Sequence, residues 1–177
     1  MKYDFTQNHF ALFGLEPAFR IDTAALDQAY RDIQGQVHPD RFADASEAER
    51  RMSMQWSTHA NEAYQTLKKP ASRARYLLQL HGVDALEESN TAMPAEFLMS
   101  QMEWREAIGD AKAARDGAAL QRLERELKLD VGMLLELLAG QLDDARDDAA
   151  AALSVRKLKF MEKLIMEVQD ASEALET

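Results

Sequence analysis

The chain contains no cysteine among its 177 residues. Disulfide bonds, thiolate zinc sites, iron–sulfur clusters ligated by cysteine and thiol catalysis are therefore excluded. A chain without cysteine also fits a reducing compartment, and we expect this protein to work in the cytoplasm.

Glycine and proline are scarce too, with seven and four residues, whereas hydrophobic residues make up 46% of the chain. The frequent residues are alanine, leucine, glutamate, glutamine and methionine, which lose little side-chain freedom in a helix. This composition predicts an all-α protein with a packed core. The length has room for one ordinary domain or two small ones.

Long apolar runs are missing: no segment approaches the roughly 18 uninterrupted apolar residues of a membrane span. The amino terminus also lacks the pattern of a signal peptide, so we expect a soluble protein with no membrane partner. The net charge of −10 is uneven. Residues 1–85 have 10 Lys/Arg against 11 Asp/Glu, and residues 86–177 have 11 against 20. An acidic body repels phosphate, which argues against a nucleic-acid partner.

The first half of the chain predicts an antiparallel pair of helices. Asp22 or Thr23 can cap a helix whose apolar residues recur every three or four positions, namely Leu26, Tyr30, Ile33 and Val37. Pro39 pushes the preceding residue out of the α region, so this helix should end near Val37. The pattern of a capping box, Ser46 with Glu49, opens a second amphipathic helix that Pro70 ends. A short further helix follows and should terminate at Gly82.

A polar break at residues 83–93 is the expected domain boundary, and three helical segments follow at roughly 94–112, 117–141 and 145–175. Two of them carry sustained apolar stripes, namely Leu120, Leu123, Leu127, Val131, Leu134, Leu138 and Leu142, and then Leu153, Phe160, Leu164 and Val168. Three amphipathic helices with short connections predict a three-helix bundle.

Nothing in the sequence indicates an enzyme, a metal site or a bound cofactor. The four histidines do not share a helical chelating spacing, and we interpret His59 and His81 as ordinary helix residues. There is no glycine-rich phosphate loop and no nucleophile elbow. The acidic pairs Asp143/Asp144 and Asp147/Asp148 are typical of a solvated helix start.

The segment 94–112 has two faces that allow two interpretations. At about 100° per residue, Trp104 and Ile108 stay near Phe97, whereas Leu98 and Met102 lie at about 100° and 140° from it. Four further residues fall at about 180° to 240°, namely Met99, Glu103, Glu106 and Asp110. These residues either form a broad core stripe beside a solvated face, or an exposed apolar patch with a carboxylate rim for a partner.

The tripeptide His38-Pro39-Asp40 by itself predicts only a turn. The helix signals around it predict a helix that ends just before it, a loop of about eight residues and a longer helix after the loop. A hydrophobic anchor lies upstream. Together these features resemble a J domain. In that family the loop contacts a DnaK-type chaperone ATPase and stimulates ATP hydrolysis without doing chemistry itself.

Five stretches extend the resemblance to the bacterial HscB family, J-type co-chaperones of iron–sulfur cluster assembly: LFGL, HPDRF, NEAYQTLKKPASRARYLLQLHG, FLMSQMEWRE and VRKLKFMEKL. They run in order from about residue 8 to residue 168, so nearly the whole chain is covered. The resemblance implies a J domain at 8–82, a linker at 83–93 and a three-helix bundle at 94–177. It also implies that the protein delivers an IscU-type scaffold to an HscA-type ATPase.

The resemblance assigns two sets of contact residues. The chaperone-binding set is His38, Pro39, Asp40, Arg31 and Arg41. The scaffold-binding set is Leu98, Met99, Met102, Glu103, Glu106 and Asp110, with Phe160 from the last helix, although Phe160 also falls on the inward stripe of its own helix. Gly35 stands where the family usually has a basic residue, and we expect it to weaken the chaperone contact. A J protein with a different client and a purely structural helical adaptor are the two alternatives.

Overall fold

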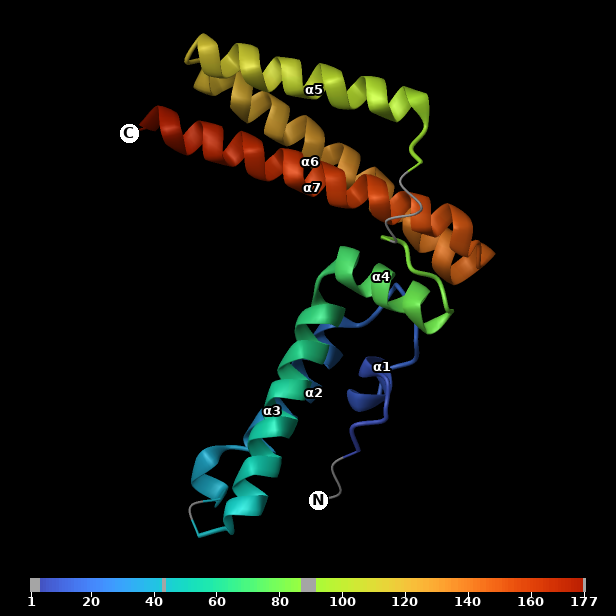
Figure 1. The fold of residues 1–177 in the computed structure, drawn as a ribbon, viewed down its shortest axis with the longest axis vertical. Coiled ribbons are helices and arrows are strands. Elements are labelled where there is room, and N and C mark those ends of the chain that lie inside the picture. Colours follow the sequence, from blue (N-terminus) through green and yellow to red (C-terminus); the bar gives the residue numbers. More distant parts are fainter. Residues whose placement is uncertain (1–3, 43, 87–91, 177) are drawn as a thin grey trace. The chain divides into compact units, whose positions relative to one another are not determined.

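A computed structural model describes residues 4–42, 44–86 and 92–176, apart from the side chains of Pro39, Asp40 and Glu176. Every regular element in these ranges is helical, as the composition predicts. The chain divides into two compact units, Met1–Leu77 and Leu78–Thr177. The division falls inside the helix α4 (Pro70–Leu80), which is labelled in Figure 1. Residues 87–91 of the predicted linker lie outside the described residues.

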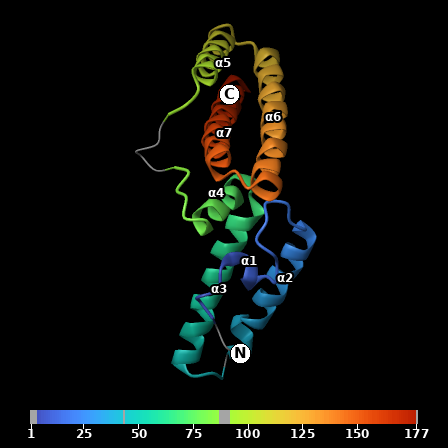
Figure 2. The same ribbon diagram turned by 90° about the vertical axis from the view of Figure 1, so that its right-hand side faces the viewer.

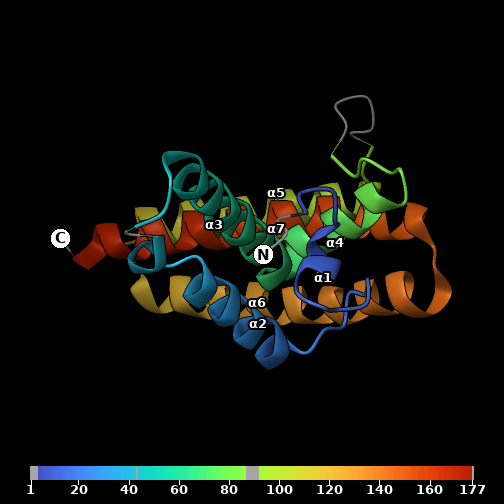
Figure 3. The ribbon, with the colours of Figure 1, turned by 90° about the horizontal axis from the view of Figure 1, so that it is seen from below.

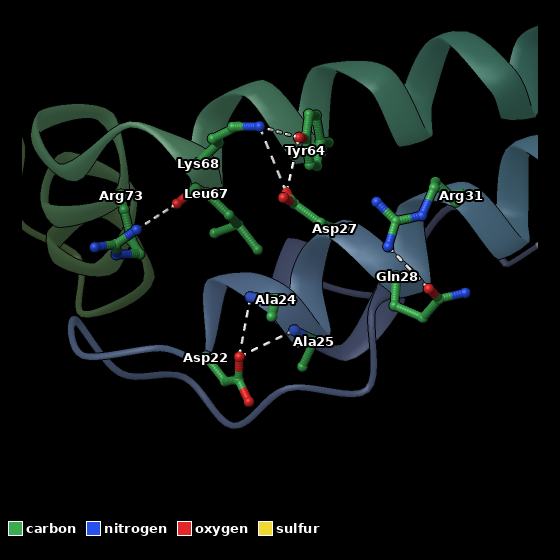
Figure 4. Close-up of polar contacts among 10 residues, drawn as sticks. All are labelled: Asp22, Ala24, Ala25, Asp27, Gln28, Arg31, Tyr64, Leu67, Lys68 and Arg73. Atoms are coloured by element: carbon green, nitrogen blue, oxygen red, sulfur yellow. Dashed lines mark hydrogen bonds and ion pairs between the residues drawn. The ribbon is translucent and has the colours of Figure 1, made fainter.

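The first unit is built on the predicted helical pair, α2 (Thr23–Gln36) and α3 (Glu47–Lys68). Asp22 caps α2 by accepting the backbone N–H groups of Ala24 and Ala25 (Figure 4). The capping box of Ser46 and Glu49 opens α3, as the sequence predicts. Both caps satisfy amide groups that a helix start leaves without partners, so the helices begin at defined residues.

Aromatic and polar contacts hold α2 against α3. The rings of Tyr30 and Tyr64 stack with centroids 4.0 Å apart. The Tyr64 hydroxyl donates to the Asp27 carboxylate at 2.8 Å, and Lys68 contacts both groups (Figure 4). The hydrogen bond from Tyr64 is the largest cause that lowers the pKa of the Asp27 carboxyl.

Two shorter helices close the first unit. The short helix α1 (His9–Leu12) packs against α3 and buries Phe10 completely. Pro70 ends α3 and begins α4 (Pro70–Leu80). Arg73 is buried, donates to the carbonyl of Leu67 at 2.6 Å and lies over the Phe19 ring. Beyond α4 the chain turns at Gly82, whose φ of 81° lies in the left-handed region that glycine favours.

The second unit is a three-helix bundle of α5 (Ala95–Ala113), α6 (Gly117–Ala139) and α7 (Asp148–Glu176), and α6 and α7 run side by side (Figures 2 and 3). Its core takes residues from all three helices, namely Ile108, Ala111, Leu120, Leu123, Leu127, Met161, Leu164, Val168 and Ala171. The predicted segments are therefore right to within a few residues. Between α6 and α7 the chain forms a π-helical turn, η2 (Gly140–Ala145), which the sequence did not predict.

The neighbouring leucines Leu127 and Leu129 lie on opposite faces of α6 and offer a matched test of this core. Leu127 is fully buried, whereas Leu129 is 69% exposed. We expect Leu127→Ala to lower the free energy of unfolding by about 2–5 kcal/mol, because it leaves a cavity. Leu129→Ala should change it by about 0.5 kcal/mol or less. Denaturant unfolding followed by circular dichroism measures both, and equal losses would contradict the described packing.

Candidate functional site

The predicted chaperone-binding loop lies between α2 and α3. Val37 caps α2 and is buried, and the buried Ser53 hydroxyl donates to its carbonyl oxygen at 3.1 Å. The next residue, His38, is exposed and its carbonyl accepts the backbone N–H of Arg41 at 2.9 Å. The backbone of Pro39–Phe42 forms a 3-10 turn, η1, and the side chains of Pro39 and Asp40 lie outside the described part. The helix thus ends where proline predicts, and the tripeptide follows at once.

The two predicted cations beside this loop are exposed. Arg31 donates to the side-chain oxygen of Gln28 at 2.8 Å on the outer face of α2 (Figure 4). Arg41 is exposed within η1. Asp32, also exposed, accepts a hydrogen bond from the Gln28 amide at 2.8 Å. A carboxylate therefore stands close to Arg31 in sequence and weakens the positive potential of this face.

A hollow of about 370 Å³ lies next to the loop and is lined by Gln34, Gly35, Val37, His38, Met54, Ser57 and Thr58. Gly35 contributes no side chain to it, and a Cβ added there would meet no atom within 4 Å. Position 35 therefore has room for the basic side chain that the family pattern leads one to expect. The hollow is a feature that periodicity of the sequence could not reveal.

Helix α5 separates an inward face from an outward one, which decides between the two interpretations of this segment. Phe97 and Trp104 pack against the bundle core with ring centroids 6.0 Å apart, and Ile108 is buried. Three large apolar side chains point outward, with exposed fractions of 46% for Leu98, 59% for Met99 and 72% for Met102. The core interpretation of Leu98 is therefore wrong, and an exposed apolar patch is present.

The carboxylate rim of this patch is also exposed. It comprises Glu103, Glu106 and Asp110 on the same helix. Exposed carboxylates keep their charge in water at low cost, so the rim presents a negative edge beside apolar side chains. We call the six outward residues Leu98, Met99, Met102, Glu103, Glu106 and Asp110 the α5 patch.

Phe160 differs from the other predicted scaffold-binding residues. It is half-buried on α7, packs against the bundle core and meets Phe97 edge-on with centroids 5.9 Å apart. The Arg105 guanidinium lies 5.3 Å from its ring centroid. The core role that the sequence left open for Phe160 is thus present in the structure.

Sequence reasoning missed a polar cluster near the start of α7. His81 lies one residue beyond α4, so its interpretation as an ordinary helix residue is wrong. Its Nδ1 lies 2.9 Å from an Asp148 carboxylate oxygen, and Arg156 donates to the carbonyl of Ala85 at 3.3 Å. These partners are 67 and 71 residues apart, so no local pattern could have paired them. The cluster ties residues 81–85 to α7.

Within the described ranges, no group of three or more metal-ligating side chains gathers. Nor is any helix of that part of the chain long and apolar enough to cross a bilayer. What the fold does present is a helical pair with a His-Pro-Asp turn and a bundle with an exposed apolar patch. These features define the class as all-α proteins that join a helical pair carrying this turn to a three-helix bundle.

Comparison with known proteins identifies the family. Residues 93–169 match the family model described as the HSCB C-terminal oligomerisation domain. The chain is 52% identical to the Co-chaperone protein HscB homolog of Aromatoleum aromaticum over 177 residues, which cover 100% of both chains. It is 54% identical to that of Burkholderia vietnamiensis over 170 residues, 96% of this chain and 97% of the relative.

Solved structures of HscB proteins support the same family assignment. The chaperone HscB from Vibrio cholerae is 40% identical with a TM-score of 0.83, over 96% of this chain and 99% of that one. The human co-chaperone protein HscB is 31% identical with a TM-score of 0.85, over 94% and 83%. The chain therefore belongs to the HscB family of co-chaperones, with an amino-terminal J domain and a carboxy-terminal helical bundle.

The structural role of Phe160 can be separated from any role in binding. We expect Phe160→Ala to lower the free energy of unfolding by about 2–4 kcal/mol, somewhat less than for a fully buried phenylalanine, because the ring packs on Phe97. Met102→Ala, at a far more exposed position, should cost about 0.5 kcal/mol or less. Thermal or denaturant unfolding measures both. An unchanged free energy of unfolding for Phe160→Ala would contradict a core role for this ring.

Proposed function

We propose that this chain binds an IscU-type scaffold protein and delivers it to an HscA-type chaperone, whose ATPase activity it stimulates. Membership of the HscB family supports the coarser role of a co-chaperone in iron–sulfur cluster assembly. The single observation that carries the finer proposal is the α5 patch, which is exposed on the bundle while the inward side of the same helix packs into its core. In this proposal the J domain spans 8–82, the linker 83–93 and the bundle 94–177, and the protein acts in the cytoplasm.

The J domain would contact the ATPase through the turn after α2. Proline fixes φ and ends the helix, so His38 and Asp40 follow at a set position on the loop. A carboxylate at Asp40 is suited to a charge-assisted, bidentate pair with an arginine of the ATPase. Arg31 and Arg41 would add the cations that meet an acidic surface.

The bundle would hold the scaffold through the α5 patch. Its apolar centre of Leu98, Met99 and Met102 loses contact with water on binding, and its carboxylates fit basic residues at the rim of an interface. The strong negative charge of residues 86–177 favours a partner whose binding surface is basic. Two surfaces on one chain would bring scaffold and ATPase together, which raises their effective concentration.

Asp40→Asn tests the chaperone contact, since it removes the charge with little change of shape. We expect stimulation of the HscA-type ATPase to fall about tenfold or more, as when one partner of a desolvated charge pair is lost. The steady-state rate of ATP hydrolysis at equal co-chaperone concentration measures this effect. Asp44→Asn, an exposed carboxylate beyond η1, is the control and should leave stimulation intact. An Asp40→Asn protein as active as the parent would sink the J-domain assignment of this loop.

The double variant Leu98→Ser with Met102→Ser tests the scaffold contact. We expect it to weaken binding of purified scaffold by about 30-fold or more, since two central apolar side chains are lost. Met166→Ser is the matched control, because Met166 is 62% exposed on a face of α7 that is turned about 120° from Phe160. Isothermal titration calorimetry gives the affinities. A parent chain that does not bind the scaffold would point to a different client.

A further inference from the structure

A pair of histidines lies where the amino-terminal segment packs on the J domain, and the proposed function uses neither of them. His9 opens α1, and His59 lies within α3. Their ring centroids are 5.9 Å apart. The His9 ring also stacks on the Tyr76 ring of α4 at 4.2 Å, and the backbone N–H of His9 donates to the Tyr76 hydroxyl at 3.0 Å. His9 therefore joins α1 to both α3 and α4.

Aromatic and apolar side chains surround this pair. Phe5 meets Trp56 edge-on with centroids 5.1 Å apart, and the His59 ring lies 5.6 Å and 5.7 Å from these two rings. Phe10, the residue after His9, is fully buried. Such surroundings offer few groups that could solvate a charge, so the neutral imidazole of His9 packs here at lower cost than the charged one.

One nitrogen of each imidazole is buried without a hydrogen-bond partner among the described residues, namely Nδ1 of His9 and Nε2 of His59. A neutral histidine has one nitrogen without a hydrogen, and that nitrogen can occupy such a place. Protonation gives His9 an N–H at both nitrogens, so Nδ1 would become a charged donor without an acceptor. An unpaired charged donor costs more than an unpaired neutral group.

The groups that face His9 act on its pKa in both directions, and the net effect is a lowering. Burial is the largest cause of the lowered pKa of His9, and the neighbouring His59 on α3 lowers it further. The Glu62 carboxylate, also on α3, acts in the opposite direction. On α4, the face of the Tyr76 ring attracts a cation as well. The lost hydration outweighs both attractions, so the packed state of α1 favours the neutral ring.

We propose that His9 makes the packing of α1 on α3 and α4 sensitive to acid: α1 stays packed while the imidazole is neutral, and a proton on His9 releases it. In the released segment the ring is hydrated, and its pKa is about 6.5. The pKa of His9 is lower in the packed state. The packing is therefore strongest above about pH 6.5 and weakens as the pH falls from there through the pKa of the packed state.

The release would affect one domain of the chain. It would uncover Phe10, which belongs to the core of the J domain, and so would loosen the unit that carries the His38 loop. Neither His9 nor His59 belongs to the three-helix bundle. Acid should thus destabilise the J domain through His9 and leave the bundle unaffected by this residue.

Proton NMR of the imidazole C–H signals of the full chain measures the pKa of His9 directly, and the spectrum of His9→Phe assigns the signal. We expect a pKa below the value of about 6.5 for histidine in a short peptide. A pKa at or above that value would contradict the proposal, because the packed state would then hold the proton at no extra cost.

Urea unfolding of the full chain at about pH 7.5 and about pH 5.5 measures the consequence. Trp104→Phe leaves Trp56 as the single tryptophan, so fluorescence then reports on the J domain. Between the two pH values, the ratio of folded to unfolded J domain should fall about threefold or more further with His9 than with His9→Phe, which keeps a ring against Tyr76 but binds no proton. His9→Gln gives the same comparison if His9→Phe does not fold.

His38→Gln is the matched control, because His38 is an exposed histidine of the same unit, and it should keep the pH dependence of the parent. An equal pH dependence in the parent and in the His9 variants would overturn the proposal. Amide hydrogen exchange, corrected for the intrinsic effect of pH, locates the change. The amides of Leu12, Gly14 and Leu15 donate within the amino-terminal segment and should lose protection in acid, whereas those of α6 should not. Unchanged protection of these three amides would show that α1 is not released.

Discussion

The end of α2 is the constraint on which the proposed chaperone-binding loop depends. Proline at position 39 prevents the helix from continuing, and the Ser53 hydroxyl holds the last carbonyl, that of Val37, against α3. The stacked rings of Tyr30 and Tyr64 and the Asp27–Tyr64 hydrogen bond keep the two helices together toward the other end. A loop that is fixed by two helices loses little conformational freedom on binding, which is what a short recognition tripeptide requires.

In the bundle, packing decides which face of each helix is buried and which is exposed. Three helices each turn one apolar side inward, and the apolar residues left outside are then few and grouped. Those on α5 lie beside a carboxylate rim. Because these side chains stay largely in contact with water, they contribute less to the stability of the isolated unit than the buried residues do. The proposed scaffold contact accounts for the apolar side chains exposed on α5.

Much of this could be predicted from local signals. Asp22, Ser46, Pro70 and Gly82 each mark a helix end through a cap or a backbone constraint, and the structure places the helix ends there. The inward stripe of α5 also followed from the helical period. The exposure of Leu98 did not, because a period alone cannot say how wide the covered face is. The pair of His81 with Asp148 depends on a contact between segments far apart in the sequence, which has no local signal. The π-helical turn that begins at Gly140 had no local signal either.

In the proposed function, one chain carries both the scaffold-binding surface and the loop that acts on the ATPase. The most direct measurement is the steady-state ATPase rate of the HscA-type chaperone with scaffold and this chain together, compared with each alone. Delivery by a single chain predicts a stimulation well above the sum of the two separate effects. A rate that equals that sum would contradict the account, because it would show that the two partners act on the ATPase independently.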